Sequence, residues 1–242
     1  MNLIIVGASS GIGREVALLF LESGHRVGIA ARRTDKLQEL CERFPEQAVA
    51  AQIDVCAADA PERLRALIEQ MGGIELYFHA AGIGKQNMAL AADIENATLQ
   101  TNGVGFTAMI GEAFRYFAAK PEGGHIGIIS SIAGTRGLGA APSYSATKAF
   151  QNTYIEALAQ QAAIRRLPIT FTDIRPGFVN TPLLDDGKNY PLMLKPESVA
   201  KDIYRSLLKK RSVRIIDWKY RLLVPLWRCI PHAIWRKLRI QN

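Results

Sequence analysis

The chain has 242 residues and 48% of them are hydrophobic, which suits one large globular α/β domain or two small ones. Its three cysteines have neither paired nor metal-ligand spacing, and no apolar run approaches the roughly 20 residues of a membrane span. These features exclude a disulfide-stapled scaffold and an integral membrane protein. We expect a cytoplasmic protein without a signal peptide or a metal.

The net charge of +8 is concentrated near the C-terminus. Residues 209–239 contain ten basic side chains and one acid, which gives +9, so the rest of the chain carries −1. The basic character is therefore a property of the C-terminal segment and not of the main domain.

Strand-like and helix-like segments alternate from the first residues. Strands are predicted at 3–6, 26–31, 48–53, 75–79, 125–130, 169–174 and 213–216, and helices at 11–23, 34–43, 61–71, 95–119, 144–166 and 197–209. This alternation predicts an α/β fold with a doubly wound parallel sheet of the Rossmann type. We expect one such domain over residues 1–216 and a basic, aromatic C-terminal extension over residues 217–242.

A glycine-rich turn separates the first strand from the first helix. Gly7, Gly11 and Gly13 permit a tight turn whose amides can approach a pyrophosphate at the helix N-terminus. Ser9, Ser10 and Ile12 lie in the same turn, and we expect all six residues to contact a dinucleotide.

The second strand ends at Arg32 and Arg33, with no acid before Asp35. In dinucleotide-binding folds an acid near this point binds a ribose 2′-hydroxyl, whereas arginine accommodates a 2′-phosphate. The pair therefore favours NADP(H) over NAD(H). The alternative is two solvated arginines at the start of a helix.

Tyr144 and Lys148 are four residues apart on a predicted helix, so they share one face of it. An ammonium close to a phenol lowers the phenol pKa, and this would make Tyr144 useful in acid–base chemistry near neutral pH. Ser131, at the end of the preceding strand, can supply a third polar group. The alternative is a tyrosine and a lysine on an ordinary surface.

Taken in order along residues 3–215, the motifs resemble those of the short-chain dehydrogenase/reductase family, of its classical type. Besides the glycine turn, they are Asp54-Val55, His79-Ala80-Ala81-Gly82, Asn102, Ser131, Tyr144-x3-Lys148, and Pro176-Gly177 with Thr181. The chain departs from the family at Val6, where threonine is usual, and at His79-Ala80, where Asn-Asn is usual. We expect both departures to affect supporting contacts only.

The resemblance implies a role for each of these residues. Tyr144 would exchange a proton with the substrate oxygen, Ser131 would polarise that oxygen, and Lys148 would lower the tyrosine pKa and bind the nicotinamide ribose. Asn102 would hold a water that connects Lys148 to solvent. Other residues would contact the cofactor: Asp54 and Val55 at the adenine, Ala80, Ala81 and Gly82 after the fourth strand, and Pro176, Gly177, Val179 and Thr181 at the nicotinamide.

The segments after residue 180 concern the substrate and partners. Apolar residues in the loop 181–195 suggest an apolar carbonyl compound, although a lid that packs on its own domain explains them equally well. The extension combines three tryptophans with basic residues, which suits a membrane surface or a segment that covers the domain, and does not suggest nucleic acid. We expect Pro225 and Pro231 to break it into short helical pieces. The family commonly forms dimers or tetramers through helices equivalent to 95–119 and 144–166, so we expect a homodimer or homotetramer.

These observations together predict an NADP(H)-dependent oxidoreductase that transfers hydride between the nicotinamide and a carbonyl or secondary alcohol. The alternative is a regulatory or scaffold protein that binds NADP without turnover. Retention of Asn102, Ser131, Tyr144 and Lys148 argues against that alternative. An extended-type epimerase or dehydratase is disfavoured because it would need a larger C-terminal substrate domain.

Overall fold

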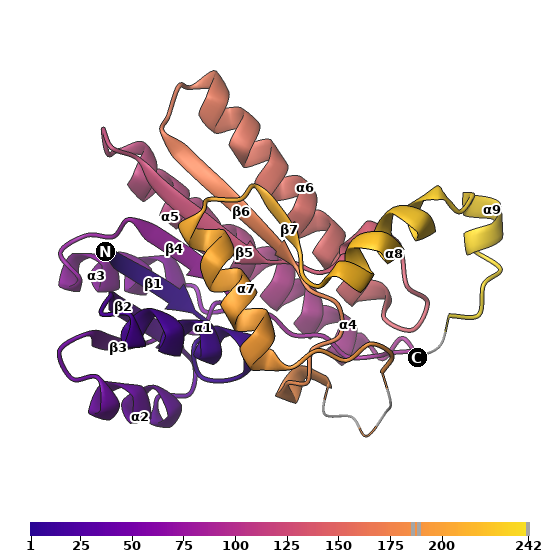
Figure 1. The fold of residues 1–242 in the computed structure, drawn as a ribbon, viewed down its shortest axis with the longest axis horizontal. Coiled ribbons are helices and arrows are strands. Elements are labelled where there is room, and N and C mark those ends of the chain that lie inside the picture. The colour runs from indigo at the N-terminus through magenta and orange to yellow at the C-terminus, as the bar shows by residue number, and fades with distance from the viewer. Residues whose placement is uncertain (185–186, 188–189, 241–242) are drawn as a thin grey trace.

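Seven parallel strands form one sheet in the computed structural model, which describes residues 1–184, 187 and 190–240 (Figure 1). The strands are β1 (Asn2–Val6), β2 (Arg26–Ala31), β3 (Ala48–Gln52), β4 (Leu76–His79), β5 (Gly124–Ile129), β6 (Ile169–Arg175) and β7 (Val213–Ile215). Their order across the sheet is β3-β2-β1-β4-β5-β6-β7. The order reverses between β1 and β4, and ligands of doubly wound folds bind at the carboxyl ends of the strands at such a point.

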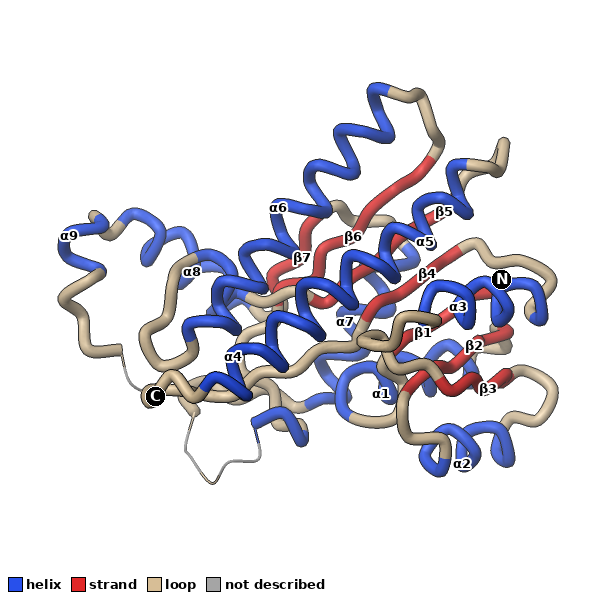
Figure 2. The backbone as a smooth tube through the Cα atoms, turned by 180° about the vertical axis from the view of Figure 1, so that it is seen from behind, coloured by secondary structure: helices blue, strands red, loops and turns tan. Residues whose placement is uncertain are grey.

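Helices cover both faces of the sheet (Figures 1 and 2). The helical segments are α1 (Gly11–Glu22), α2 (Asp35–Arg43), α3 (Ala60–Gln70), α4 (Ala92–Leu99), η1 (Gln100–Gly105), α5 (Phe106–Ala118), η2 (Ile132–Thr135), α6 (Pro142–Ile164), η3 (Pro182–Leu184), α7 (Pro196–Leu208), α8 (Trp218–Cys229) and α9 (His232–Trp235). One core joins α1, α2 and α7 to the sheet, and a second joins α3, α5 and α6 to its other face.

Strand β1 has a continuous apolar run because both of its faces are buried. Leu3 and Ile5 belong to the first core, whereas Ile4 and Val6 belong to the second, so alternate residues are buried on opposite faces. The predicted fold class and single domain are confirmed, and the predicted elements are present with ends that differ by a few residues.

Two local features differ from the sequence prediction. The predicted helix 95–119 contains a π-helical turn, η1, between α4 and α5. Pro225 was expected to break the C-terminal segment, and this is wrong, because α8 continues through it. Pro225 and Arg221 are both exposed, so water can reach the carbonyl that loses its partner at proline.

The beginning of the C-terminal extension packs on the domain. Tyr220 and Val224 of α8 are buried against Ile132, and Phe178 and Trp227 pack around them. Within the described part of the chain, no helix is long and apolar enough to cross a membrane. Of the loop 181–195, residues 185, 186, 188 and 189 lie outside the described residues, so this predicted substrate segment is only partly described.

Candidate functional site

The glycine turn between β1 and α1 brings backbone segments closer together than larger side chains would allow. Gly7 has a φ of +96°, and a Cβ on it would lie 2.6 Å from the Ala81 amide nitrogen. A Cβ on Gly13 would collide with the Gly7 carbonyl oxygen. Ser10 is the N-cap of α1, yet its side chain makes no capping hydrogen bond. The first amides of α1 are therefore available to an anion, so the turn fits a dinucleotide pyrophosphate.

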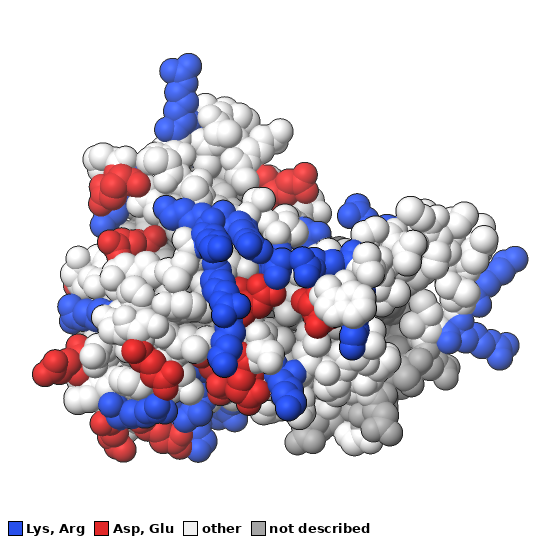
Figure 3. Space-filling model, viewed as in Figure 1, with Lys and Arg blue, Asp and Glu red and all other residues white. Residues whose placement is uncertain are grey.

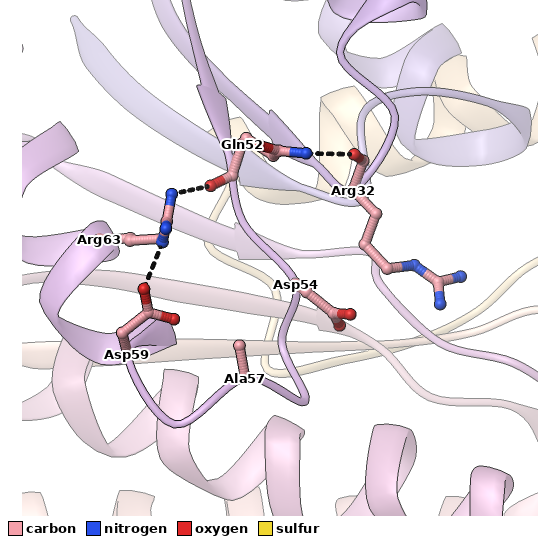
Figure 4. Close-up of a pocket in the computed structure, with 6 residues that line it drawn as sticks. All are labelled: Arg32, Gln52, Asp54, Ala57, Asp59 and Arg63. Carbon is pink, nitrogen blue, oxygen red and sulfur yellow. Dashed lines mark hydrogen bonds and ion pairs between the residues drawn. The ribbon is translucent and has the colours of Figure 1, made fainter.

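Two arginines flank the end of β2, beside this turn. Arg33 donates from Nη2 to the hydroxyls of Ser10 at 3.0 Å and Ser9 at 3.4 Å. Arg32 borders a cavity of about 200 Å³ (Figure 4). The other lining residues are Gln52, Asp54, Ala57, Asp59 and Arg63. The cavity lies between the ends of β2 and β3, so the guanidiniums are placed where a dinucleotide carries its adenosine ribose.

Ser131 and Tyr144 lie within hydrogen-bond distance of each other. Ser131 follows the end of β5, and Tyr144 lies in the first turn of α6. Ser131 is the buried N-cap of η2, and its hydroxyl accepts a hydrogen bond from the Ala133 amide at 3.0 Å. Burial raises the pKa of the Tyr144 phenol, and its hydrogen bond with Ser131 opposes that rise. The net direction is upward, so Tyr144 is protonated at neutral pH.

Lys148 is also buried on α6, and its ammonium is held by two oxygen atoms. Nζ donates to the Ile129 carbonyl and to Gln151 Oε1, at 2.9 Å in each case. Burial lowers the pKa of Lys148 to about 8, while the charge of Asp173 acts in the opposite direction. The ammonium lies 5.8 Å from the centre of the Tyr144 ring.

The expected effect of Lys148 on Tyr144 is not found in the structure. We predicted that the ammonium would lower the phenol pKa, but that pKa is raised. The reason is that partial burial withdraws water from the phenol, which disfavours the phenolate more strongly than the hydrogen bond with Ser131 favours it.

Asn102 lies in the π-helical turn η1, an arrangement that occurs frequently at functional sites. Its Oδ1 accepts from the Ile83 amide at 2.9 Å, and its Nδ2 donates to the Ile83 carbonyl at 2.7 Å. Its backbone carbonyl accepts from Gln151 Nε2 at 2.9 Å. Gln151 therefore links Lys148 directly to Asn102, and the water predicted between these two residues stays a prediction.

The predicted nicotinamide-binding segment follows β6 and lies beside both halves of the site. The Pro176 carbonyl accepts from the Ile132 amide at 3.1 Å and from the Ser131 hydroxyl at 3.4 Å. A Cβ on Gly11 would lie 3.4 Å from the side chain of Thr181. The segment thus joins Ser131 to the glycine turn.

The remaining predicted cofactor residues lie between these groups. Ala81 contacts Gly7, as described above, and a Cβ on Gly82 would lie 3.2 Å from Asn102 Oδ1 and 3.6 Å from Lys148 Nζ. Val179 forms an isolated parallel bridge with Leu194, which closes the base of the loop 181–195.

Three residues that sequence reasoning missed also form the site. Gln151 is fully buried and follows Lys148 by one helical turn. Gly84 lies so close to the Tyr144 ring that a Cβ there would collide with it. The Tyr220 ring lies against Gly177, and its hydroxyl accepts from the Phe178 amide at 3.2 Å. Of these three residues, Gln151 had a signal in the sequence, because it follows Lys148 by three residues on the same predicted helix face.

His79 is a buried histidine at the end of β4. Its Nδ1 lies 2.8 Å from the Tyr77 hydroxyl, and its ring packs against Phe106. Burial, assisted by the charge of Lys148, lowers the pKa of His79 to about 3. The imidazole is therefore neutral at physiological pH and is buried among aromatic rings.

Comparison with known proteins finds relatives that match most of the chain. The family model described as short chain dehydrogenase matches residues 2–189. An uncharacterized oxidoreductase of Myxococcus xanthus is 30% identical over 248 residues, which cover 98% of this chain and 96% of that protein.

Two solved structures share the fold. An alcohol dehydrogenase of Thermococcus sibiricus, complexed with 5-hydroxy-NADP, has a TM-score of 0.78 and 22% identity, over 89% of this chain and 95% of its own. A short chain dehydrogenase/reductase of Burkholderia phymatum, in complex with NAD, has a TM-score of 0.83 and 17% identity, over 100% and 96%. Together with the family match, these findings show that the chain belongs to the short-chain dehydrogenase/reductase family of oxidoreductases.

Proposed function

We propose that the protein is an NADP(H)-dependent reductase of an apolar ketone or aldehyde. The observation that carries the proposal is the cluster of Ser131, Tyr144 and Lys148, which lies beside a glycine turn that fits a dinucleotide. The cofactor would be held by the turn and by Arg32 and Arg33, and it would supply or accept the hydride.

The residues of the chain handle the proton. Tyr144, whose raised pKa keeps the phenol protonated, would donate a proton to the substrate oxygen as that oxygen becomes an alkoxide. Ser131 would donate a hydrogen bond to the same oxygen. The Lys148 ammonium, held by Ile129 and Gln151, would stabilise the phenolate that remains. A protonated tyrosine suits reduction of a carbonyl better than oxidation of an alcohol.

The preference for NADP(H) rests on the two arginines. The end of β2 offers guanidiniums to a ribose 2′-phosphate, and the nearest acid along the chain, Asp35, belongs to α2. The proposal that the substrate is apolar is based on Leu192 and Met193, which are exposed in the loop before α7.

Oligomerisation and cellular location are also proposals. Leu99, Val104 and Phe150 are exposed on the helical layer formed by α4, η1 and α6, where a homodimer or homotetramer would bury them. We place the enzyme in the cytoplasm, with peripheral contact at a membrane surface through its C-terminal extension.

A carbonyl screen that follows NADPH absorbance tests the proposed function. The variant Tyr144→Phe should reduce kcat by about 10²–10⁴ while NADPH still binds, as measured by fluorescence titration. The matched control is Tyr154→Phe, a half-buried tyrosine on the same helix, which should keep wild-type turnover. Wild-type turnover by Tyr144→Phe would remove Tyr144 from its proposed role.

A further inference from the structure

Helix α8 is apolar on two opposite sides. Tyr220, Val224 and Trp227 lie three or four residues apart and face the domain. Trp218, Leu222 and Leu226 repeat at the same interval on the other side, where they are 58%, 61% and 69% exposed. A surface helix normally has a polar outer face. The exposed apolar side of α8 is therefore unusual, and exposed apolar patches of this kind mark interaction sites.

The inner side holds α8 in a fixed orientation. Trp227 Nε1 donates to Thr135 Oγ1 at 2.8 Å, and Arg136 donates to the Arg228 carbonyl at 2.6 Å. Trp235, in the following helix, donates to the Gly137 carbonyl at 2.9 Å. The exposed apolar side chains are therefore presented by a tethered helix, and fraying of the C-terminus does not account for their exposure.

Cations border the exposed apolar face. Residues 217–240 carry six basic side chains and one acid, Asp217. At 100° per residue, Lys219 lies along one border of the exposed face and Arg221 and Arg228 lie along the other. In Figure 3, Lys and Arg side chains lie around a largely uncharged surface where α8 and α9 project from the domain.

We propose that this face of α8, defined by Trp218, Leu222 and Leu226 with its flanking cations, docks on an anionic lipid membrane. An apolar stripe bordered by Lys and Arg, with a tryptophan at its end, fits the boundary between headgroups and acyl chains. A second copy of the chain fits less well, because a two-fold contact would place the basic borders of both copies together, and residues 217–240 offer one acid, Asp217, to pair with six cations.

Docking of this face would bring the catalytic site close to the lipid. The inner side of α8 packs on Ile132, which follows Ser131 directly, and on Phe178, which follows Gly177. We infer that the substrate is a carbonyl compound that partitions into the bilayer, such as a long-chain aldehyde. This second step rests on the proposed function, namely the reductase activity, whereas the docking itself does not depend on that activity.

Co-sedimentation of the full-length protein with vesicles tests the docking. The wild type should bind vesicles of phosphatidylcholine mixed with phosphatidylglycerol and bind pure phosphatidylcholine more weakly. The variant Leu222→Ser/Leu226→Ser should bind the mixed vesicles at least about tenfold more weakly. The variant Arg221→Gln/Arg228→Gln should lose about fivefold for each charge removed.

The matched control is Ile164→Ser/Leu208→Ser, which removes exposed apolar residues from α6 and α7. This control should bind vesicles as the wild type does, and all variants should keep the wild-type melting temperature. Absence of wild-type binding, or equal binding by Leu222→Ser/Leu226→Ser, would overturn the proposal. So would a wild-type dimer that this variant dissociates without any vesicle binding, because the occupant would then be a second copy.

The substrate step has a separate readout. Anionic vesicles should raise kcat/KM for decanal in the wild type and not in Leu222→Ser/Leu226→Ser. An equal effect on both proteins would overturn the inference about the substrate. Tyr144→Phe should sediment like the wild type. Vesicle binding without any reductase activity would therefore contradict the proposed function and leave the docking intact.

Discussion

The buried link through Gln151 leads to a prediction about the pH dependence of stability. Gln151 accepts from the Lys148 ammonium and donates to the Asn102 carbonyl, both at 2.9 Å. Gln151→Met keeps a similar volume and removes both hydrogen bonds. The unpaired Asn102 carbonyl should cost about 1–3 kcal/mol at any pH, and loss of an acceptor for a charged donor should cost about 1.5–3 kcal/mol more.

Only the second cost depends on pH. Burial holds the folded-state pKa of Lys148 at about 8, below its ordinary value of about 10.4, so folding is penalised while the lysine is protonated. This penalty is fully present below about pH 8 and disappears as the pH rises towards the unfolded-state pKa. Removing the acceptor lowers the folded-state pKa further, by about one to two units, and so increases the penalty at neutral pH.

Urea unfolding at about pH 7 and about pH 10 measures the difference. The destabilisation caused by Gln151→Met should be smaller at the higher pH by about 1–2 kcal/mol, because the lysine is then neutral in the folded state. The control Gln160→Met, at an exposed glutamine of the same helix, should change stability little at either pH. An equal loss at both pH values would show that Gln151 does not stabilise the Lys148 ammonium, and the reasoning would be refuted.

Three further predictions concern single contacts of the site. Gly177→Ala should lower the free energy of unfolding by about 1–3 kcal/mol, because its Cβ would collide with the Tyr220 ring. In urea unfolding, Tyr220→Leu should partly restore the stability of Gly177→Ala, and strictly additive losses would contradict the contact. Arg32→Ser/Arg33→Ser should raise KM for NADPH about tenfold or more and leave KM for NADH unchanged; an equal rise for both would argue against 2′-phosphate binding. His79→Asn should leave the pH profile of kcat unaltered between about pH 5 and pH 8, because its pKa of about 3 keeps the imidazole neutral there; a lost limb would assign His79 a catalytic role.

The sequence by itself determined the fold class and most of the candidate site. Short apolar runs and the helical spacing of apolar residues are local signals that can be read from the sequence. Their alternation along the chain predicts a parallel sheet with helices on both faces. In such a sheet the carboxyl ends of the strands share one edge, so motifs after the strands must converge. This is why the glycine turn, Ser131 and the Pro176 segment could be placed in one site from their order along the chain.

Only the tertiary structure revealed the contacts between segments that are distant in sequence. Gln151 joins Lys148 to Asn102, and Tyr220 covers Gly177, because α6 packs beside η1 and α8 returns to the domain. Pro225 looked like a helix break in sequence, but its effect depends on whether water reaches the freed carbonyl.

The direction of the Tyr144 pKa also required the structure. Helical spacing placed Lys148 on the same face and predicted a lowered phenol pKa, but spacing does not report burial. In the folded protein the loss of water around the phenol outweighs the polar neighbours, and the pKa rises. Sequence order therefore predicts that the motifs after the strands share one edge of the sheet, whereas the exclusion of solvent in the folded protein decides the protonation of Tyr144.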